Sequence, residues 1–331
     1  ALPFFRERFP RSGKWQERLN VWHNWRHING QLSELESKHR FRVDLVFLNY
    51  LDPYLISYTP HSLVRLLMPR TWAGLYCFPA TLRLNPGLLN ETTHLRDRDH
   101  MMRTPNCLAI AFHDEDIRPA FSKRIGKPVF YFPEIADLGA PDPDSALARE
   151  IRGKAKGRTV IGNIGLEKHK GYYELMRLAR IADPGRFYFV FTGRDDGTLY
   201  DFLDAEQRAE LSRFIENLPE NCLWAPAHFR DEAAYNAVLQ AFDILYMVYK
   251  HFYGSSNRLT KAVHFGKPVL ADDAYCIGST VKQYGLGETV ADTRPETLLQ
   301  ALNRLQARID TKAFPGARWP EYLRHNSREA L

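Results

Sequence analysis

The chain has 331 residues, 44% of them hydrophobic and 25% charged, with a formal net charge of +6. This length suits two domains of ordinary size. No apolar run reaches the roughly 20 residues of a membrane-spanning helix. The four cysteines stand singly, which argues against a disulfide framework or a structural zinc site. The charge favours anionic partners such as nucleotide diphosphates or phospholipid surfaces, but we expect no nucleic-acid partner, because basic and acidic residues are interleaved without a recognisable binding motif.

The first segment of the chain is basic and rich in aromatic residues. From Trp15 to Leu35 the apolar residues roughly follow a helical period, and a basic helix that contains tryptophan can lie on an anionic membrane surface. The tryptophans do not form one clean face, so we expect this helix to pack within its own domain. The sequence thus predicts a cytoplasmic protein and leaves open peripheral contact with the inner face of the membrane.

Short apolar runs typical of buried parallel strands follow in the first half of the chain. They cover residues 43–49, 73–77, 107–112 and 129–132. The segments between them are long enough for crossover connections, which predicts an α/β domain over residues 1–145. Residues 140–156 are rich in Pro, Asp and Ala and then charged, so the domain connection is expected there.

The second half alternates strands and helices more clearly, which predicts an open parallel sheet over residues 146–317. Strands are expected at 159–164, 187–192, 222–224, 244–248 and 269–271. Helices are expected at 172–181, 199–215 (one or two), 232–240, from Ser256 onward, at 279–284 and at 295–309. A C-terminal helix within 318–331 either stays here or crosses back to the first domain.

Three loops at the predicted strand ends combine glycine with basic or capping residues, which is typical of a phosphate-binding edge. The first is Gly162 to Gly165, leading to Lys170, and the second holds Gly193 and Arg194. The third opens the helix near Ser256, where free backbone N–H groups carry a partial positive charge. Its residues are Tyr253, Ser255, Ser256, Asn257 and Arg258. An ordinary capped helix is the alternative interpretation of this stretch.

Residues 159–293 resemble the C-terminal domain of GT-B glycosyltransferases, most closely the family 4 type. The resemblance rests on the order and spacing of IGNIGLEKHKGYYELMRLA, FVFTGRD, LQAFDILYMV and GSSNRLTKAVHFGKPVLADD, with IGSTVKQYGLG behind them. The N-terminal half matches more loosely. The resemblance implies two Rossmann-like domains facing a cleft, with the acceptor on the N-terminal side.

The same resemblance implies a nucleotide-diphosphate sugar as co-substrate, without a cofactor or a metal ion, since helix N–H groups and basic side chains neutralise the leaving diphosphate. The first-loop residues with Lys170 would face the diphosphate, the Ser256 to Arg258 stretch would hold it from the other side, and the loop containing His228 would border the base. These roles are carried over from the family and do not follow from spacing alone.

The chain departs from the family pattern in several places. Asn163 stands where many members have arginine, and Tyr253 and Lys261 replace two glutamates, the second of which commonly contacts the ribose. Phe78 stands where a histidine is often expected. No opening strand with a glycine-rich loop is recognisable, so either the first part of the fold lies outside this chain or the domain is reduced.

The leading hypothesis is a glycosyltransferase that moves a sugar from a nucleotide diphosphate to a glycan, lipid-linked or small-molecule acceptor. Asp52 and His113 are candidate bases for an inverting reaction, with a helix or turn cap as the alternative role of Asp52. In a retaining reaction the leaving diphosphate would be the base. A non-catalytic GT-B module that binds a sugar nucleotide or a glycan is the second hypothesis, and a sugar-nucleotide epimerase is a third.

Overall fold

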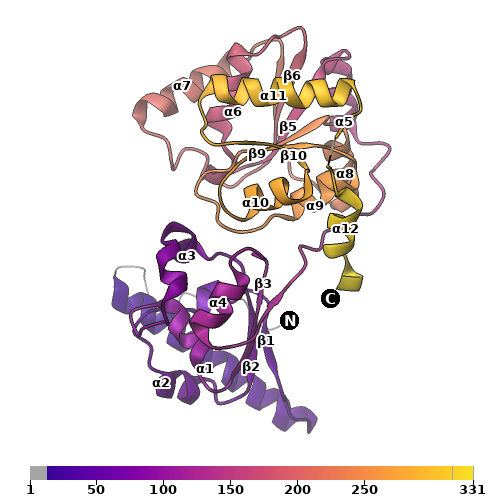
Figure 1. Cartoon of the computed structure of the whole chain (residues 1–331). Coiled ribbons are helices and arrows are strands. Elements are labelled where there is room, and N and C mark those ends of the chain that lie inside the picture. The colour runs from indigo at the N-terminus through magenta and orange to yellow at the C-terminus, as the bar shows by residue number, and fades with distance from the viewer. Residues whose placement is uncertain (1–12, 315, 331) are drawn as a thin grey trace. The chain divides into compact units, whose positions relative to one another are not determined.

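The computed structural model describes residues 13–314 and 316–330. These residues form two compact units (Figure 1). The first runs to Phe132 and includes Tyr253–Ser255, and the second consists of Pro133–Phe252 and the chain from Ser256 onward. The division after Phe132 comes earlier than the division expected between residues 145 and 146.

The first unit contains a four-stranded parallel sheet of order β1-β2-β3-β4, as the apolar runs predict. Its strands are β1 (Val46–Leu48), β2 (Trp72–Tyr76), β3 (Cys107–Phe112) and β4 (Val129–Tyr131). Its helices are α1 (Lys14–His39), α2 (His61–Leu67), α3 (Ala80–Leu84) and α4 (Arg118–Ile125), with 3-10 turns η1 (Asp52–Tyr54), η2 (Pro86–Asn90) and η3 (Arg98–Arg103). Within residues 13–45 no strand precedes β1.

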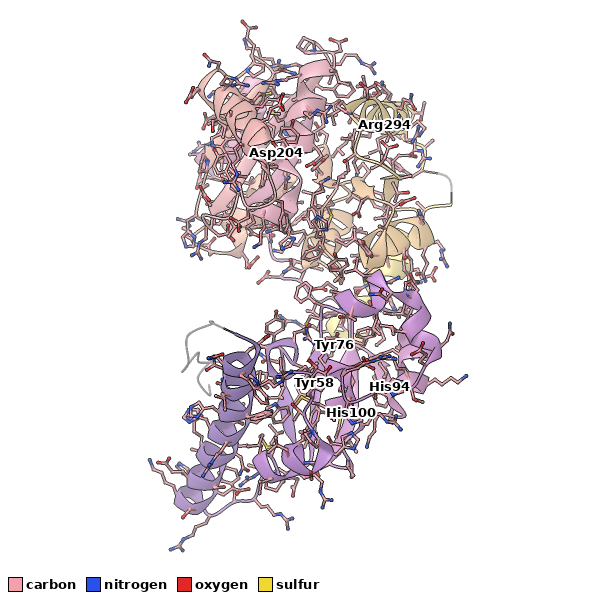
Figure 2. All side chains as sticks on the ribbon, turned by 90° about the vertical axis from the view of Figure 1, so that its left-hand side faces the viewer. Tyr58, Tyr76, His94, His100, Asp204 and Arg294 are labelled. Carbon is pink, nitrogen blue, oxygen red and sulfur yellow. The ribbon has the colours of Figure 1, made fainter. Side chains whose placement is uncertain are left out.

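Helix α1 packs into the core of this unit, as predicted for residues 15–35. Val21, Trp25 and Ile28 are buried on one side of it, and the indole N–H of Trp25 donates to the Tyr54 carbonyl at 2.8 Å. Trp15 is 66% exposed, and Arg18 lies between its ring and that of Tyr58, which Figure 2 labels. In the described residues no helix is both long and apolar enough to span a membrane. The basic residues before position 13 lie outside the described part, and membrane contact remains a prediction.

The second unit contains a six-stranded parallel sheet of order β10-β9-β8-β5-β6-β7. Its strands are β5 (Thr159–Leu166), β6 (Phe187–Asp195), β7 (Cys222–Pro226), β8 (Ile244–Met247), β9 (Val269–Asp272) and β10 (Gly287–Val290). The strand order reverses at β5, because β6 and β7 continue on one side and β8 begins the other. Ligands of such sheets bind where the order reverses, beyond the carboxyl ends of the strands.

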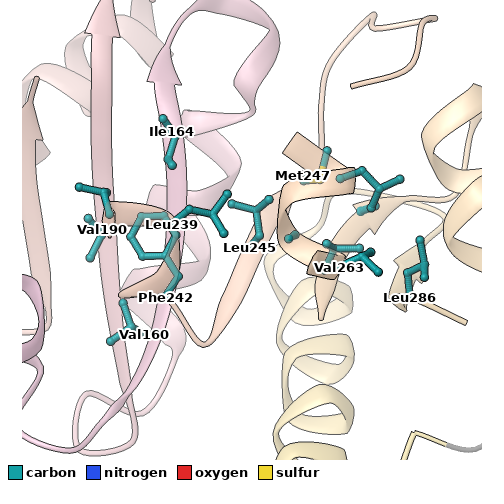
Figure 3. Close-up of a cluster of buried hydrophobic side chains, with 14 of the residues drawn as sticks. Val160, Ile164, Val190, Leu239, Phe242, Leu245, Met247, Val263 and Leu286 are labelled. Atoms are coloured by element: carbon teal, nitrogen blue, oxygen red, sulfur yellow. The ribbon is translucent and has the colours of Figure 1, made fainter. Parts of the chain in front are cut away.

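Helices cover both faces of this sheet. Helices α6 (Tyr172–Ile181), α7 (Ala205–Glu216) and α11 (Pro295–Asp310) pack on one face. Helices α5 (Ala146–Ala155), α8 (Glu232–Gln240), α9 (Asn257–His264), α10 (Tyr275–Tyr284) and α12 (Trp319–His325) pack on the other. Figure 3 shows part of the second core, with Phe242 among Val160, Val190 and Leu239.

The main differences from the sequence prediction concern three elements. Helix α5 lies where a connection was expected, and its N-terminus is capped by the Ser145 hydroxyl. The segment 199–215 forms a single helix that begins after Asp204, whose side chain forms a capping box with Gln207 (Figure 2). Strand β10 was not expected. Helix α12 groups with the second unit and buries Tyr322 in its core.

Candidate anion-binding site

Two glycines touch at the carboxyl ends of β5 and β6. Gly165 and Gly193 adopt φ values of 91° and 100°, a region that favours glycine. A Cβ atom at Gly193 would lie 2.2 Å from the backbone nitrogen of Gly165, closer than any real contact allows. The backbones can approach because both side chains are absent, and the phenol of Tyr172 donates to the Gly165 carbonyl. The backbones of the two glycines therefore form a narrow surface without side chains at the edge of the sheet, which we call the glycine floor.

Lys170 lies beside this floor and is buried. It belongs to the 3-10 turn η4 (Lys168–Lys170), and its side chain is 6% exposed. The ammonium sits 4.1 Å from the centroid of the Tyr249 ring and 5.3 Å from that of Phe252. Burial, with the nearby charge of Arg258, lowers the pKa of Lys170 below its ordinary value.

Arg258 reaches the same place from the first turn of α9. Its Nε donates to the Tyr235 hydroxyl at 3.1 Å and its Nη1 to the Tyr249 hydroxyl at 3.3 Å. A Cβ atom at Gly165 would lie 2.8 Å from its Nη2, so the guanidinium occupies the space that a side chain at Gly165 would need. Arg258 is 17% exposed, so this first-turn cation is largely buried.

These two cations are only partly neutralised. Among the described residues the carboxylate that pairs with them is Glu167, at 3.9 Å from Lys170 Nζ and 3.9 Å from Arg258 Nη2. Burial opposes ionisation of Tyr249, but the charges of Lys170 and Arg258 outweigh it and hold the pKa of its phenol below the ordinary value. The cluster therefore has an excess of positive charge and suits an anionic ligand.

The start of α9 agrees with the sequence prediction. Ser256 is the N-cap residue, in extended conformation and without a side-chain capping bond, and Asn257 beside it is exposed. Lys261, by contrast, is already bound within the unit. Its buried ammonium pairs with Glu232 at 2.5 Å and contacts the Asn236 side-chain oxygen at 2.6 Å.

Comparisons of the sequence give no relative: no model of a known protein family matches the chain, and no curated protein matches it. Solved structures do resemble it. A UDP-forming alpha,alpha-trehalose-phosphate synthase from Burkholderia xenovorans is 16% identical, with a TM-score of 0.63 over 98% of this chain and 78% of that one. Sucrose-phosphate synthase from Thermosynechococcus elongatus is 16% identical, with a TM-score of 0.64 over 95% of this chain and 76% of that one. The N-terminal domain of trehalose-6-phosphate phosphatase from Candida albicans is 13% identical, with a TM-score of 0.63 over 96% and 74%.

The chain has the GT-B fold. The fold class predicted from the sequence is therefore confirmed, with one parallel sheet in each of the two units.

Within the GT-B fold, two residues of the expected first loop lie inside a strand. Strand β5 continues to Leu166, so Gly162 and Asn163 are part of the sheet. A Cβ atom at Gly162 would lie 2.2 Å from the Phe242 ring, which explains the glycine by packing. Asn163 is fully buried and donates to the Lys170 carbonyl at 2.6 Å, so it supports the lysine. Both were expected to face the diphosphate from a loop; they lie inside the strand instead, and their contact with a ligand stays a prediction.

The remaining donor residues predicted for the GT-B fold come from several segments of the chain. Arg194 is exposed near the end of β6, and His228 is exposed after β7. Tyr253 and Ser255 group with the first unit, whereas Ser256 groups with the second. The structure therefore brings together Gly165, Gly193, Lys170 and Arg258 from the predicted set.

The two predicted catalytic residues lie in the first unit. Both carboxylate oxygens of Asp52 accept backbone hydrogen bonds, from Cys77 at 2.8 Å and Phe78 at 2.9 Å. Burial raises the pKa of Asp52 above its ordinary value. This is the capping role that was weighed against catalysis. His113 Nδ1 lies 2.8 Å from the Phe132 carbonyl, after β3.

Sequence reasoning missed the residues that surround the two cations. Tyr249 lies two residues after the end of β8, at a carboxyl end where a ligand-facing residue is expected, so the rule for parallel sheets could have identified it. Glu167 follows β5 in the same way. Tyr235 lies on α8 without any local signal. Among the described residues, no three His, Cys, Asp or Glu side chains gather as a metal-binding group.

Proposed function

We propose that this protein is a glycosyltransferase that moves a sugar from a nucleoside diphosphate to a glycan, lipid-linked or small-molecule acceptor. The observation that carries the proposal is the pair of buried cations, Lys170 and Arg258, where the strand order of the second sheet reverses. Glu167 neutralises them only from a distance. A diphosphate would supply the missing negative charge.

The leaving diphosphate would be stabilised by these side chains without a metal ion. Lys170 and Arg258 place positive charge in a largely buried site, where charge stabilisation is strong. The backbone at Gly165 and Gly193 admits a phosphate closely, and the N–H groups at the start of α9 add donors. His228 would border the base, and His113 remains the candidate base for an inverting reaction, because Asp52 is committed to backbone groups.

The first test compares UDP with uridine in a thermal-shift experiment. UDP is chosen because one protein of the same fold is a UDP-forming synthase. UDP at 100 times its dissociation constant should add about 2.7 kcal/mol of stability, and uridine should add much less, because it lacks the diphosphate. An equal shift from uridine would contradict the assignment of the two cations to the diphosphate.

A non-catalytic module is the second candidate function. Family members commonly have a glutamate at the position of Lys261. In this chain Lys261 instead forms an ion pair with Glu232. A similar fold also occurs as the N-terminal domain of a protein named as a phosphatase. Slow release of UDP from UDP-glucose would favour the enzyme. Tight binding of UDP-glucose without any UDP release would favour the module.

A further inference from the structure

A pocket of about 150 Å³ lies within the second unit, next to the turn Lys168–Lys170 that carries one of the two cations. Leu199, Phe202 and Leu203 form its apolar wall, and polar side chains line the remainder: Lys168, Glu174, Gln207, Lys250 and His251. Lys168 and Lys250 lie close in sequence to Lys170 and Tyr249, so one pair of loops serves both sites.

The aromatic ring in the apolar wall of the pocket is that of Phe202, and neighbouring side chains hold it in place. Phe202 is 43% exposed, so part of its ring is accessible to a ligand. His169 and His251 both contact its ring edge-to-face, each at 5.1 Å between centroids, and the Lys168 ammonium lies over the ring at 5.4 Å from its centroid. His251 has a φ of 51°, uncommon for a residue other than glycine. Backbone strain of this kind concentrates at binding sites.

The polar rim differs from the cation cluster in its charge. Lys168 Nζ pairs with Asp201 at 3.2 Å, and Lys250 Nζ pairs with Glu174 at 2.9 Å. Each lysine therefore has its own carboxylate, and the rim has little excess charge. Such pairs place a donor next to an acceptor, which is what a hydroxyl group requires, since it both donates and accepts.

From these features we infer that the pocket binds a single pyranose ring. A pyranose has one apolar face of C–H groups, which fits the Phe202 ring, and an edge of hydroxyls, which fits the lysine–carboxylate pairs. The volume of about 150 Å³ suits a ligand of about this size. The inference rests on the proposed function, because a sugar held here would lie beside the site proposed for the diphosphate.

Saturation-transfer NMR on the full chain tests this inference with methyl α-glucopyranoside, glucose 6-phosphate and inorganic phosphate. We expect saturation of the ring C–H protons of both sugars, with similar affinity for the two. Phe202→Ala should weaken sugar binding about fivefold, the size expected for loss of an aromatic contact. Phe202→Tyr should retain it. The matched control is Phe130→Ala, which removes another exposed ring, in the first unit, and should leave binding unchanged.

Three results would overturn the inference: no saturation transfer to either sugar, binding unaffected by Phe202→Ala, or competition by inorganic phosphate, which would make the pocket an anion site. The UDP thermal shift is measured on the same variants and should stay at the wild-type value in Phe202→Ala. Loss of UDP binding with retained sugar binding would contradict the proposed function alone, so the two failures are distinguishable.

Discussion

At the scale of single residues, we expect Arg258 to determine how strongly the second unit binds an anion. Its guanidinium contacts two tyrosine hydroxyls and has one distant carboxylate. Arg258→Ala should weaken UDP binding by roughly 1.5 to 3 kcal/mol, the range for hydrogen bonds to charged groups. The free energy of unfolding without ligand should change by less than about 1 kcal/mol, because removing a poorly neutralised buried charge offsets the lost bonds. Calorimetric titration and urea unfolding measure the two effects.

Arg294→Ala provides the control for this variant. Arg294 is exposed in the same unit and pairs with Asp292 at 2.9 Å (Figure 2). Its removal deletes an equal charge without touching the cluster, so UDP affinity should stay at the wild-type value. If both variants lost affinity equally, general attraction between a basic protein and an anion would explain the binding, and the specific role of Arg258 would be wrong.

Asp272 makes the stability of the protein depend on pH. Burial, with the adjacent charge of Asp273, raises its pKa from 3.8 to about 7, although Lys250 partly opposes this. A carboxyl group whose pKa is higher in the folded state binds its proton more tightly there. Its contribution to stability is therefore lost as the pH rises from about 4 to about 7.

Asp272→Asn should remove this dependence. At pH 8 the variant should be more stable than the wild type by on the order of 1 kcal/mol or more, since each pKa unit corresponds to about 1.4 kcal/mol. At pH 4 the two should unfold alike in urea. Asp144→Asn, at an exposed position, should show no such difference. A constant offset between Asp272→Asn and wild type at every pH would refute the titration of Asp272.

At the scale of elements, the contact between β5 and β6 depends on two missing side chains. Gly193→Ala places a methyl group 2.2 Å from the Gly165 backbone and also strains a positive φ. We expect a loss of about 3 kcal/mol or more, from overpacking and backbone strain together. Urea unfolding of the purified variant measures this loss.

Gly197→Ala is the matched control for that prediction. Gly197 has a φ of 78°, but a Cβ atom there meets nothing within 4 Å. This variant should therefore lose only the strain energy, about 1 to 2 kcal/mol. Equal losses at both positions would show that the close approach of the two strands contributes nothing.

Elements with strong apolar periodicity were predictable from the sequence. The helices Tyr172–Ile181 and Glu232–Gln240 were predicted with the bounds that the structure shows. Helix α5 was missed because Pro141 and Pro143 precede it and resemble a linker, although Ser145 provides a cap. Strand β10 was missed because its sequence, GETV, is polar and its first three residues are only half-buried.

The candidate site was predictable only in part. Lys170, Arg258 and the glycines stand at strand ends or at a helix start, where local rules apply. Tyr235 approaches Arg258 from the middle of another helix, and that contact depends on how α8 and α9 pack. The extension of β5 through Gly162 and Asn163 depends on Phe242, which fills the place of a side chain at Gly162. Such tertiary contacts leave no local pattern in the chain.

At the scale of the whole molecule, each unit has its own hydrophobic core. Because the proposed UDP site lies in the second unit, UDP should raise the unfolding temperature of that unit and leave the first unit unchanged. About 2.7 kcal/mol of ligand stabilisation corresponds to roughly 5 to 10 °C for a domain of this size. Scanning calorimetry should resolve the shifted and the unshifted transition. A shift of the first unit alone would place the ligand elsewhere.

The guanidinium of Arg258 and a side chain at position 165 compete for one volume, because a Cβ at Gly165 would lie 2.8 Å from Arg258 Nη2. A side chain at position 165 would therefore require the guanidinium of Arg258 to move, and it would also strain the positive φ of this position. In an alignment of homologous sequences, arginine at position 258 should occur together with glycine at position 165, and the two should be lost together. If the pair covaries in this way, we expect it to mark proteins that hold an anion from the helix side.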